Sequence, residues 1–535
     1  MPEPESDLLS DWLRRAAAAT PDAPAIVEEG VEGDRVTSFR ELFEQSAALA
    51  LRFVEHGIQK QDRIALVMPK TTEAIVSVFA SLLAGAIYVP IHPRWPRERI
   101  ETTLSDCAAR LVIEGETEGR SHPPRITDRQ TGASIPWQQA PTGLTNTNED
   151  ALPRAGAADP AIILFTSGST GRPKGVVLSH RAVSAFVKWS AREFQISSSD
   201  RIACPSPLGF DLSTFDIFNM ALCGATCVLV PSHIVWMPRF LVQFARQARV
   251  SCWYSVPSIL AGMLQEGRLA EHDYPALRVI LFAGEVFAAR NVARLQAAVP
   301  HAVCANLYGP TETNVVTWYR VPSGFDESLP LPIGQSCPYA TVTVDAANGE
   351  LLAGGDSLMT GYWGRDDDTG RAFVTVEGKR YYRTGDRVSL APDGKYLFLG
   401  RLDRQVKRRG FRIELGEIEA ALARHEGLLE AAAVATEVNT NVNVNASTTV
   451  HIKDGRMGTV ITAFVRARSG GAVTLLEAKA HCARTLPPYM LPDNIVFLDA
   501  LPKGSRGKID YIALGKIAEA LEYSELDQEG LYHGS

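Results

Sequence analysis

Residues 166–175 read Thr-Ser-Gly-Ser-Thr-Gly-Arg-Pro-Lys-Gly, and this segment is the most informative in the chain. Glycine lets the main chain approach a ligand closely, and hydroxyl and main-chain N–H groups can surround a polyphosphate. The apolar run 161–165 precedes the segment, and a second strand-like run begins at Val176. The segment is therefore predicted to be a phosphate-binding loop between two strands of an α/β fold.

The spacing of this loop differs from that of a P-loop. A P-loop reads G-x-x-x-x-G-K-S/T and leads directly into a helix, whereas here the order is G-x-x-G-x-x-K-G and a strand pattern follows. A flexible Ser/Gly linker is the alternative, but a linker does not normally lie between two apolar strands or end in Pro173-Lys174-Gly175.

The decapeptide resembles the phosphate loop of the adenylate-forming superfamily. This superfamily includes acyl-CoA ligases, luciferase-like enzymes and the adenylation domains of nonribosomal peptide synthetases. The resemblance implies an ATP-dependent ligase in which the loop binds the phosphates of ATP through Thr166, Ser167, Gly168, Ser169, Thr170, Gly171 and Lys174.

The bulk properties limit the class of protein. The length of 535 residues predicts at least two domains, because single cores stop growing beyond about 250–300 residues. The net charge of −7 gives no electrostatic reason to expect nucleic acid or an anionic membrane as a partner. The eight cysteines contain no C-x-x-C pair, so neither a zinc site nor a disulfide framework is predicted. The acidic N-terminus has no apolar signal region, which favours the cytoplasm.

Helix-like and strand-like patterns alternate through the first 330 residues or so. Alternation of this kind predicts layers of helices on parallel sheets. From about residue 332, short strands and glycine turns predict a β-rich subdomain. The clearest predicted elements are strands at 64–68, 86–90, 227–230, 279–282 and 303–307 and a helix at 72–84.

A domain boundary is predicted near residues 400–404, where a strand ends and a new pattern begins. The fold class is therefore α/β, with a large N-terminal domain (1–402) of layered α/β subdomains plus a β-rich subdomain. A small, mobile C-terminal α+β domain (403–522) follows, with mobility implied by the resemblance. The acidic and polar residues 523–535 are predicted to form a flexible tail.

Tyr308-Gly-Pro-Thr-Glu312 is an ordinary turn when taken alone. An aromatic ring can stack on a base, and a glutamate oxygen is a hard ligand for Mg²⁺, which bridges phosphates. Downstream of the phosphate loop, the segment is similar to the superfamily's adenine and magnesium motif. The resemblance implies that Tyr308 stacks on adenine, Thr311 contacts the α-phosphate and Glu312 holds Mg²⁺, with Asn306 and Gly309 also in the ATP site.

Tyr382-Arg-Thr-Gly-Asp386 resembles a third superfamily motif. A buried aspartate near a glycine turn could cap a helix, but the resemblance assigns Asp386 to the ribose hydroxyls, with Arg401 beside it. Asp403 matches the position of the superfamily's hinge, about which the C-terminal domain alternates between adenylation and thioester formation.

Lys508 lies in Gly507-Lys508-Ile-Asp510, near the end of the chain. A lysine in a glycine-rich segment is usually solvated, but this one resembles the superfamily's C-terminal catalytic lysine. A cation that bridges the substrate carboxylate and the α-phosphate would stabilise the transition state. Lys503 and Arg506 are the weaker neighbouring candidates.

Asp211, in Gly209-Phe-Asp-Leu-Ser, discriminates best between substrates. In peptide synthetase adenylation domains, the aspartate at this place receives the substrate's α-ammonium. The alternative is an aspartate that caps a helix at Ser213. A fatty or aryl acid has no ammonium group and would leave the buried carboxylate unpaired, which is costly.

The remaining pocket positions implied by the resemblance are apolar or aromatic and favour a compact apolar amino acid. They are Leu212, Phe215, Tyr254, Leu281, Ala283, Leu307, Val315 and Val316. The set looks like that of stand-alone L-proline-activating enzymes, which load proline onto a peptidyl carrier protein supplied in trans. The predicted function is ATP- and Mg²⁺-dependent formation of prolyl-AMP, followed by transfer to the carrier's phosphopantetheine thiol. D-alanine or another small amino or β-amino acid is the alternative substrate. An acyl-CoA ligase and an inactive nucleotide-binding protein are further alternatives.

Overall fold

The computed structural model describes residues 6–29, 33–115, 123–137, 152–168, 171–438, 458–468, 473–504 and 507–530. The chain divides into two compact units. Unit 1 comprises Met1–Pro93, Thr103–Phe165 and Lys174–Leu402, and unit 2 comprises Arg94–Thr102, Thr166–Pro173 and Asp403–Ser535. The main chain passes from unit 1 to unit 2 between Leu402 and Asp403, where the sequence pattern changes.

Unit 1 contains a nine-stranded sheet whose middle strands are parallel. Buried runs of apolar residues form these strands, as expected where helices cover both faces. In the described residues the order is β16 (Gln335–Ser336), β15 (Thr317–Arg320), β14 (Val303–Tyr308), β13 (Val279–Ala283), β12 (Cys252–Ser255), β10 (Arg201–Cys204), β11 (Thr226–Leu229), β1 (Pro24–Glu28) and β2 (Arg35–Ser38).

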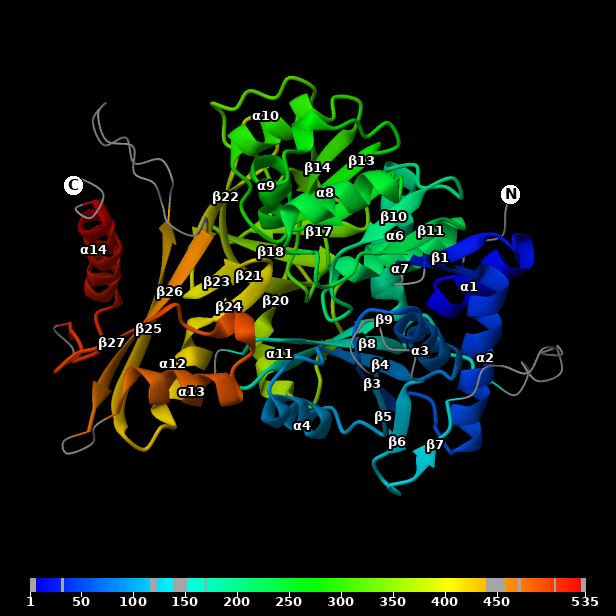
Figure 1. Cartoon of the computed structure of the whole chain (residues 1–535), viewed down its shortest axis with the longest axis horizontal. Helices are drawn as coiled ribbons and strands as arrows, with labels where there is room; N and C mark the ends of the chain where they lie inside the picture. The colour runs from blue at the N-terminus through cyan, green and yellow to red at the C-terminus, as the bar shows by residue number, and fades with distance from the viewer. Residues whose placement is uncertain are drawn as a thin grey trace. The chain divides into compact units, whose positions relative to one another are not determined.

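A second sheet of unit 1 carries the strands on both sides of the phosphate loop. Helix α3 (Thr72–Leu83) contacts its strands β3 and β4 (Figure 1). The order in the described residues is β19 (Gly361–Tyr362), β9 (Lys174–Ser179), β8 (Pro160–Thr166), β4 (Ile87–Ile91), β3 (Arg63–Val67), β5 (Leu111–Glu114), β6 (Arg125–Asp128) and β7 (Ser134–Ile135).

A third sheet of unit 1 is antiparallel, so the predicted β-rich subdomain is present. Its strands are β17 (Ala340–Val344), β18 (Glu350–Gly355), β21 (Lys379–Leu390), β20 (Phe373–Val376) and β22 (Tyr396–Arg401). The other helices of unit 1 are α1 (Leu9–Ala19), α2 (Phe39–Glu55), α6 (His180–Glu193), α7 (Leu212–Cys223), α8 (Pro238–Gln247), α9 (Pro257–Gln265), α10 (Ala289–Ala298) and α11 (Asp366–Ala372). Helix α4 (Arg97–Asp106) crosses from one unit to the other in sequence.

Helix α7 is the most deeply buried helix that contributes to the site. Its residues from Leu212 to Ala221 are all buried, and Phe218 makes an edge-to-face contact with Phe79 at 5.9 Å. The helix ends at Gly224, whose φ of 68° is a left-handed conformation that glycine adopts without strain. Because α7 is buried, its position determines where Asp211, the residue immediately before the helix, lies.

Unit 2 is an α+β unit with its own apolar core. The long strands β25 (Leu428–Val438) and β26 (Gly458–Ala467) pair antiparallel, and β27 (Asn494–Phe497) pairs with β26 (Figure 1). A hairpin precedes them, formed by β23 (Gln405–Arg408) and β24 (Phe411–Glu414). The helices are α12 (Leu415–Ala423), α13 (Leu475–Thr485) and α14 (Tyr511–Gly530).

The predicted start of the tail at residue 523 is corrected by α14, which continues to Gly530. Leu and Glu are good helix formers, so a run that is polar and acidic overall still continues a helix. Residues 531–535 lie outside the described residues. In the described part of the chain, no helix combines the length and the apolar character needed to cross a membrane.

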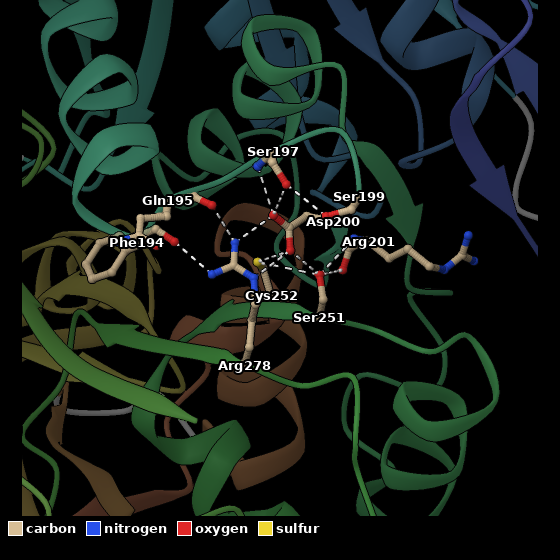
Figure 2. A network of polar contacts seen from close by, with 9 residues as sticks. All are labelled: Phe194, Gln195, Ser197, Ser199, Asp200, Arg201, Ser251, Cys252 and Arg278. Carbon is tan, nitrogen blue, oxygen red and sulfur yellow. Dashed lines mark hydrogen bonds and ion pairs between the residues drawn. The ribbon is translucent and has the colours of Figure 1, made fainter. Parts of the chain in front are cut away.

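A buried ionic network joins the amino ends of three parallel strands of the large sheet (Figure 2). Asp200 accepts hydrogen bonds from Arg278 at 2.6 and 2.9 Å and from the hydroxyl of Ser251 at 2.7 Å. Burial acts to raise the pKa of Asp200, but the hydrogen bonds from Arg278, Ser251 and the main chain of Ser197 hold it below its ordinary value. Because these residues directly precede or begin β10, β12 and β13, the network fixes the ends of those strands.

Arg278→Ala is expected to lower the free energy of unfolding by about 1–3 kcal/mol, because it removes the charged partner of a buried carboxylate. Denaturant titration at pH 7 measures the loss. Because the pKa of Asp200 is lowered in the folded state, the loss shrinks as the pH falls through about 4 and below. Arg320→Ala is the matched control, since its ion pair with Glu193 is solvent-exposed and worth about 0–1 kcal/mol. Equal losses in the two variants would contradict the role of the network.

Candidate active site

The residues predicted to line the amino-acid pocket all lie in unit 1, several of them on neighbouring parallel strands. The rings of Phe215 and Tyr254 meet edge to face at 5.4 Å. Tyr254 lies opposite Leu281 in the β12–β13 pair, and Ala283 lies opposite Leu307 in the β13–β14 pair. The predicted lining is buried throughout, and it comprises Leu212, Phe215, Tyr254, Leu281, Ala283, Leu307, Val315 and Val316.

Asp211 precedes α7 and is half-buried. Its side chain makes no capping hydrogen bond to the helix, so the alternative role of a helix cap is wrong. The hydroxyl of Thr214 instead donates to the main-chain oxygen of Asp211 at 2.5 Å. Burial, followed by the charge of Asp211, raises the pKa of Tyr254 well above its ordinary value.

Asp216 is a buried carboxyl of α7 that sequence reasoning missed. It is 0% exposed, and neither carboxyl oxygen has a hydrogen-bond partner among the described residues. Burial, followed by the neighbouring thiol of Cys204, raises the pKa of Asp216 well above its ordinary value. Lys70, which is also buried, donates to the main-chain oxygen of Cys204 and opposes this shift. Burial therefore favours the protonated form of Asp216, one residue after Phe215 of the pocket.

Asp216→Asn is expected to change stability in a pH-dependent way. A carboxyl whose pKa is raised by folding stabilises the folded state below its unfolded pKa of about 4, and this contribution is lost as the pH rises through the folded pKa. Asparagine does not titrate, so the variant does not lose this contribution. As the pH rises, its free energy of unfolding should increase relative to that of the wild type by about 1.4 kcal/mol for each unit by which folding raises the pKa of Asp216. Melting temperatures from pH 4 to pH 9 test this. A constant difference between the two proteins would contradict the assignment.

The predicted adenosine residues form one hydrogen-bonded group in unit 1. Tyr308, at the end of β14, donates its hydroxyl to Asp386 at 2.5 Å. Arg401 donates to the other oxygen of Asp386 at 2.6 Å, and the two residues are opposite each other in the β21–β22 pair. Burial, followed by the charge of Asp386, raises the pKa of Tyr308 well above its ordinary value. Each carboxylate oxygen retains a second acceptor site, so Asp386 can still accept from ribose hydroxyls.

The turn after β14 brings Glu312 next to this group. Gly309 is required there, because a Cβ atom at this position would lie 1.7 Å from the main-chain oxygen of Asn314. Glu312 is 1% exposed and accepts a hydrogen bond from Tyr362 at 2.8 Å. Thr311 is half-buried, and the amide of Asn306 donates to the main-chain oxygen of Pro332 at 2.8 Å.

Among the described residues, no group of three or more His, Cys, Asp or Glu side chains could hold a metal ion. Mg²⁺ at nucleotide sites uses one or two protein carboxylates together with the substrate's phosphates. Glu312, a buried carboxylate held by a hydroxyl, is a suitable protein ligand of that kind. The residues present therefore fit MgATP.

The phosphate loop is divided between the two units. Lys174 begins β9 in unit 1, where its ammonium nitrogen lies 3.5 Å from Asp368 and 5.1 Å from the ring centre of Tyr362. In unit 2, the hydroxyl of Ser167 donates to the main-chain oxygen of Arg412 at 2.7 Å. Thr166, Gly168 and Gly171 belong to the same unit, and the predicted loop residues Ser169 and Thr170 lie outside the described residues.

The predicted residues of the C-terminal part lie in unit 2. Lys508 is exposed on a tight turn, in which its main-chain oxygen accepts from Gly504 at 2.8 Å. The competing candidate Lys503 is ion-paired with Glu430 at 2.6 Å. Asp403, the first residue of this stretch of unit 2, accepts a hydrogen bond from the main chain of Gln405 at 3.1 Å.

Gly354-Gly-Asp-Ser357 imitates the attachment site of a carrier protein's phosphopantetheine in sequence alone. Ser357 is 0% exposed. Gly355 ends β18 with a φ of 113°, and a Cβ there would lie 2.3 Å from the main-chain oxygen of Tyr339. The segment is therefore structural, because a buried hydroxyl is inaccessible to modification.

Two residues beside Lys174 and Glu312, Tyr362 and Asp368, were missed by sequence reasoning. Tyr362 comes from β19 and Asp368 from α11, both almost 200 residues after Lys174. The only signal in the sequence is the run Gly361-Tyr362-Trp363, whose pairing with β9 cannot be read from local patterns.

Comparison with known proteins shows the family of the chain. The family model described as AMP-binding enzyme matches residues 13–363, and that of the AMP-binding enzyme C-terminal domain matches residues 417–508. An L-proline–L-prolyl-carrier protein ligase of Pseudomonas fluorescens is 35% identical over 533 residues, covering 96% of this chain and 99% of the relative. A ligase of the same name from Streptomyces coelicolor is also 35% identical, covering 90% of this chain and 92% of the relative.

Solved structures share the fold. The crystal structure of IdnL1 is 28% identical with a TM-score of 0.74, covering 94% of this chain and 100% of that one. The Vibrio cholerae adenylation domain AlmE, solved with glycyl-adenosine-5'-phosphate, superposes with a TM-score of 0.79 at 23% identity, covering 97% and 99% of the two chains. The phosphate-loop sequence, the buried adenosine group and both matched domains lead to one conclusion: this chain belongs to the AMP-binding enzyme family.

Proposed function

We propose that this enzyme uses ATP to convert L-proline to prolyl-AMP, with release of pyrophosphate, and then transfers the prolyl group to the phosphopantetheine thiol of a stand-alone peptidyl carrier protein. The observation that carries the proposal is the position of Asp211 immediately before α7, whose buried residues Leu212 and Phe215 belong to the proposed apolar and aromatic lining. Two relatives that span nearly the whole chain and are named for this activity support it.

The substrate's ammonium pairs with Asp211. Proline carries a positive charge and two N–H donors at physiological pH, and both match a carboxylate acceptor. A fatty or aryl acid brings no ammonium group to Asp211, which makes an acyl-CoA ligase the poorer assignment. The rings of Phe215 and Tyr254, whose centres lie 5.4 Å apart, are bulky members of the proposed lining and favour a compact substrate side chain.

The nucleotide binds across the end of β14 and the interior of β21 at Asp386. Tyr308 presents its ring to adenine, and Asp386, held by Tyr308 and Arg401, accepts from the ribose hydroxyls. Thr311 contacts the α-phosphate, while Asn306 and Gly309 complete the adenine side. Glu312 would hold Mg²⁺, which when bound neutralises charge on the phosphates.

In the first half-reaction, a carboxylate oxygen of proline attacks the α-phosphorus of ATP. The bond from this phosphorus to the bridging oxygen breaks, and pyrophosphate leaves. Lys174 and the loop residues 166–171 stabilise the departing phosphates, and Lys508 bridges the substrate carboxylate and the α-phosphate. Positioned cations of this kind supply most of the catalysis in phosphoryl-type transfer.

In the second half-reaction, the carrier's thiol sulfur attacks the carbonyl carbon of prolyl-AMP and AMP leaves. The C-terminal domain, which begins at Asp403 and includes α14, moves about Asp403 between the two half-reactions. We place the reaction in the cytoplasm, since seven of the eight cysteines are buried thiols, which suits a reducing compartment.

Activation of D-alanine or another small amino acid is the second candidate. One observation favours keeping it: no polar side chain in the predicted lining recognises the pyrrolidine ring, so size alone separates proline from other small residues. An inactive nucleotide-binding protein is disfavoured by the joint presence of Lys174, Glu312, Asp386 and Lys508.

Carrier loading tests the proposal. The purified enzyme is incubated with ATP, Mg²⁺, one amino acid and a holo-carrier, and the intact mass of the carrier is measured. Proline is expected to add one prolyl group to the holo-carrier and nothing to the apo-carrier, which lacks the thiol. Loading of alanine in place of proline would contradict the substrate assignment.

A further inference from the structure

The short strand β19 connects the two predicted phosphate-binding elements of unit 1. It pairs antiparallel with β9, where Tyr362 lies opposite Val176. Immediately after β19 in the sequence, Trp363 donates its main-chain N–H to the main-chain oxygen of Gly175 at 2.8 Å. Shortly before β19 in the sequence, Met359 donates its main-chain N–H to the main-chain oxygen of Glu312 at 2.7 Å. The main chain thus joins the strand that begins at Lys174 to the turn that carries Glu312.

The side chain of Tyr362 makes the same connection. Its hydroxyl donates to a carboxylate oxygen of Glu312 at 2.8 Å, and the face of its ring lies 5.1 Å from the ammonium nitrogen of Lys174. Tyr362 is 8% exposed and Glu312 is 1% exposed, so solvent competes little with these contacts. One tyrosine therefore contacts both the predicted metal ligand and the predicted phosphate lysine.

The partner of Lys174 on its other side is Asp368. Their contact of 3.5 Å exceeds the usual 2.7–2.9 Å of a charge-assisted hydrogen bond. Asp368 has a closer partner in Arg371, which donates a hydrogen bond to it at 2.6 Å. Lys174 can consequently leave Asp368 for a phosphate oxygen while it keeps its place over the Tyr362 ring.

We propose that Tyr362 is a positioning residue that orients the Glu312 carboxylate for Mg²⁺ and holds Lys174 at a fixed place relative to it, so that both act on the same polyphosphate. The inference rests on the proposed function, in which Glu312 holds Mg²⁺ and Lys174 binds phosphates. A hydroxyl donating to one oxygen of Glu312 leaves that carboxylate acceptor sites for a metal. Hydrogen bonds to metal-binding carboxylates are the usual means of fixing their orientation.

Two substitutions separate the two contacts. Tyr362→Phe removes the hydroxyl, with its hydrogen bond to Glu312 and its longer contact with the hydroxyl of Tyr382 at 3.5 Å, and retains the ring beneath Lys174. Loss of such a partner typically lowers metal affinity about 10–100-fold. Tyr362→Leu removes the ring as well, and losing the cation–ring contact should cost a further two- to fivefold or so in nucleotide affinity. Tyr381→Phe is the matched control, since Tyr381 is equally buried at 8% exposure and lies opposite Val374 in the β20–β21 pair.

The test is calorimetric binding of a non-hydrolysable ATP analogue at a series of Mg²⁺ concentrations. Tyr362→Phe should require at least about tenfold more Mg²⁺ for half-maximal binding, with the KM for the amino acid unchanged, and Tyr381→Phe should match the wild type. Melting temperatures verify that each variant is folded. An unchanged Mg²⁺ requirement in Tyr362→Phe, with a clear weakening in Glu312→Gln, would overturn the inference alone. Absence of Mg²⁺-dependent binding in the wild type would overturn the proposed function and the inference with it.

Discussion

Lys508→Ala is expected to lower the rate of prolyl-AMP formation by about 10²–10³-fold with a much smaller change in the KM for ATP. Lys508 is exposed on its turn and makes no structural ion pair in the described residues of unit 2, so its removal should leave the fold intact. In the proposed role, Lys508 is a cation that acts where negative charge develops in the transition state, and one such group is worth about this factor. Single-turnover formation of the adenylate measures the effect.

Lys503→Ala is the matched control for this prediction. Lys503 lies on the same turn, five residues earlier, but its ammonium is held by Glu430 at 2.6 Å. Its replacement should leave adenylate formation close to that of the wild type. Adenylate formation by Lys508→Ala at the wild-type rate, or a greater loss in Lys503→Ala, would remove Lys508 from the catalytic role.

Asp211→Ala is expected to lower kcat/KM for the amino acid by about 10²–10³-fold, because it removes the anionic partner of the substrate's ammonium in a poorly solvated site. The side chain of Asp211 caps no helix, so the substitution should not destabilise α7. Asp211→Asn retains a hydrogen-bond acceptor without the charge and should lie between alanine and the wild type. The KM for ATP, measured at saturating amino acid, serves as the internal control.

The ammonium role fails if Asp211→Ala keeps the wild-type kcat and KM for the amino acid. A matching loss in nucleotide binding would also count against it, since that would indicate general damage to unit 1. Adenylate formation is the relevant measurement for both variants, because carrier loading adds a second chemical step.

Most elements of the fold were predictable because their signals are local. The predicted helix at 72–84 is α3, Thr72–Leu83, and the predicted strands at 64–68 and 279–282 are β3 and β13, with ends shifted by one residue. Apolar runs of strand length and a helical period are properties of neighbouring residues. The end of α14 was missed because its last residues are acidic and polar, which resembles a tail in composition although the residue types favour helix.

The motif residues of the site were predictable, whereas the residues that lie next to them in the fold were not. The motifs at Tyr308, Asp386 and Arg401 identified a group that the structure joins by hydrogen bonds. Their individual roles stay predictions. Asp216 and Tyr362 carry no such signal, because the burial of a carboxyl and the partner of a tyrosine depend on strands far away in sequence.

The central claim, activation of L-proline, is tested most directly by amino-acid-dependent ATP–pyrophosphate exchange over a panel of amino acids. This reaction reports the first half-reaction alone and needs no carrier protein. The account predicts strong exchange with L-proline, weak exchange with alanine or valine, and none with aspartate, lysine or arginine, because the predicted pocket offers one carboxylate and an apolar lining. Exchange supported by alanine or valine but not by L-proline would contradict it.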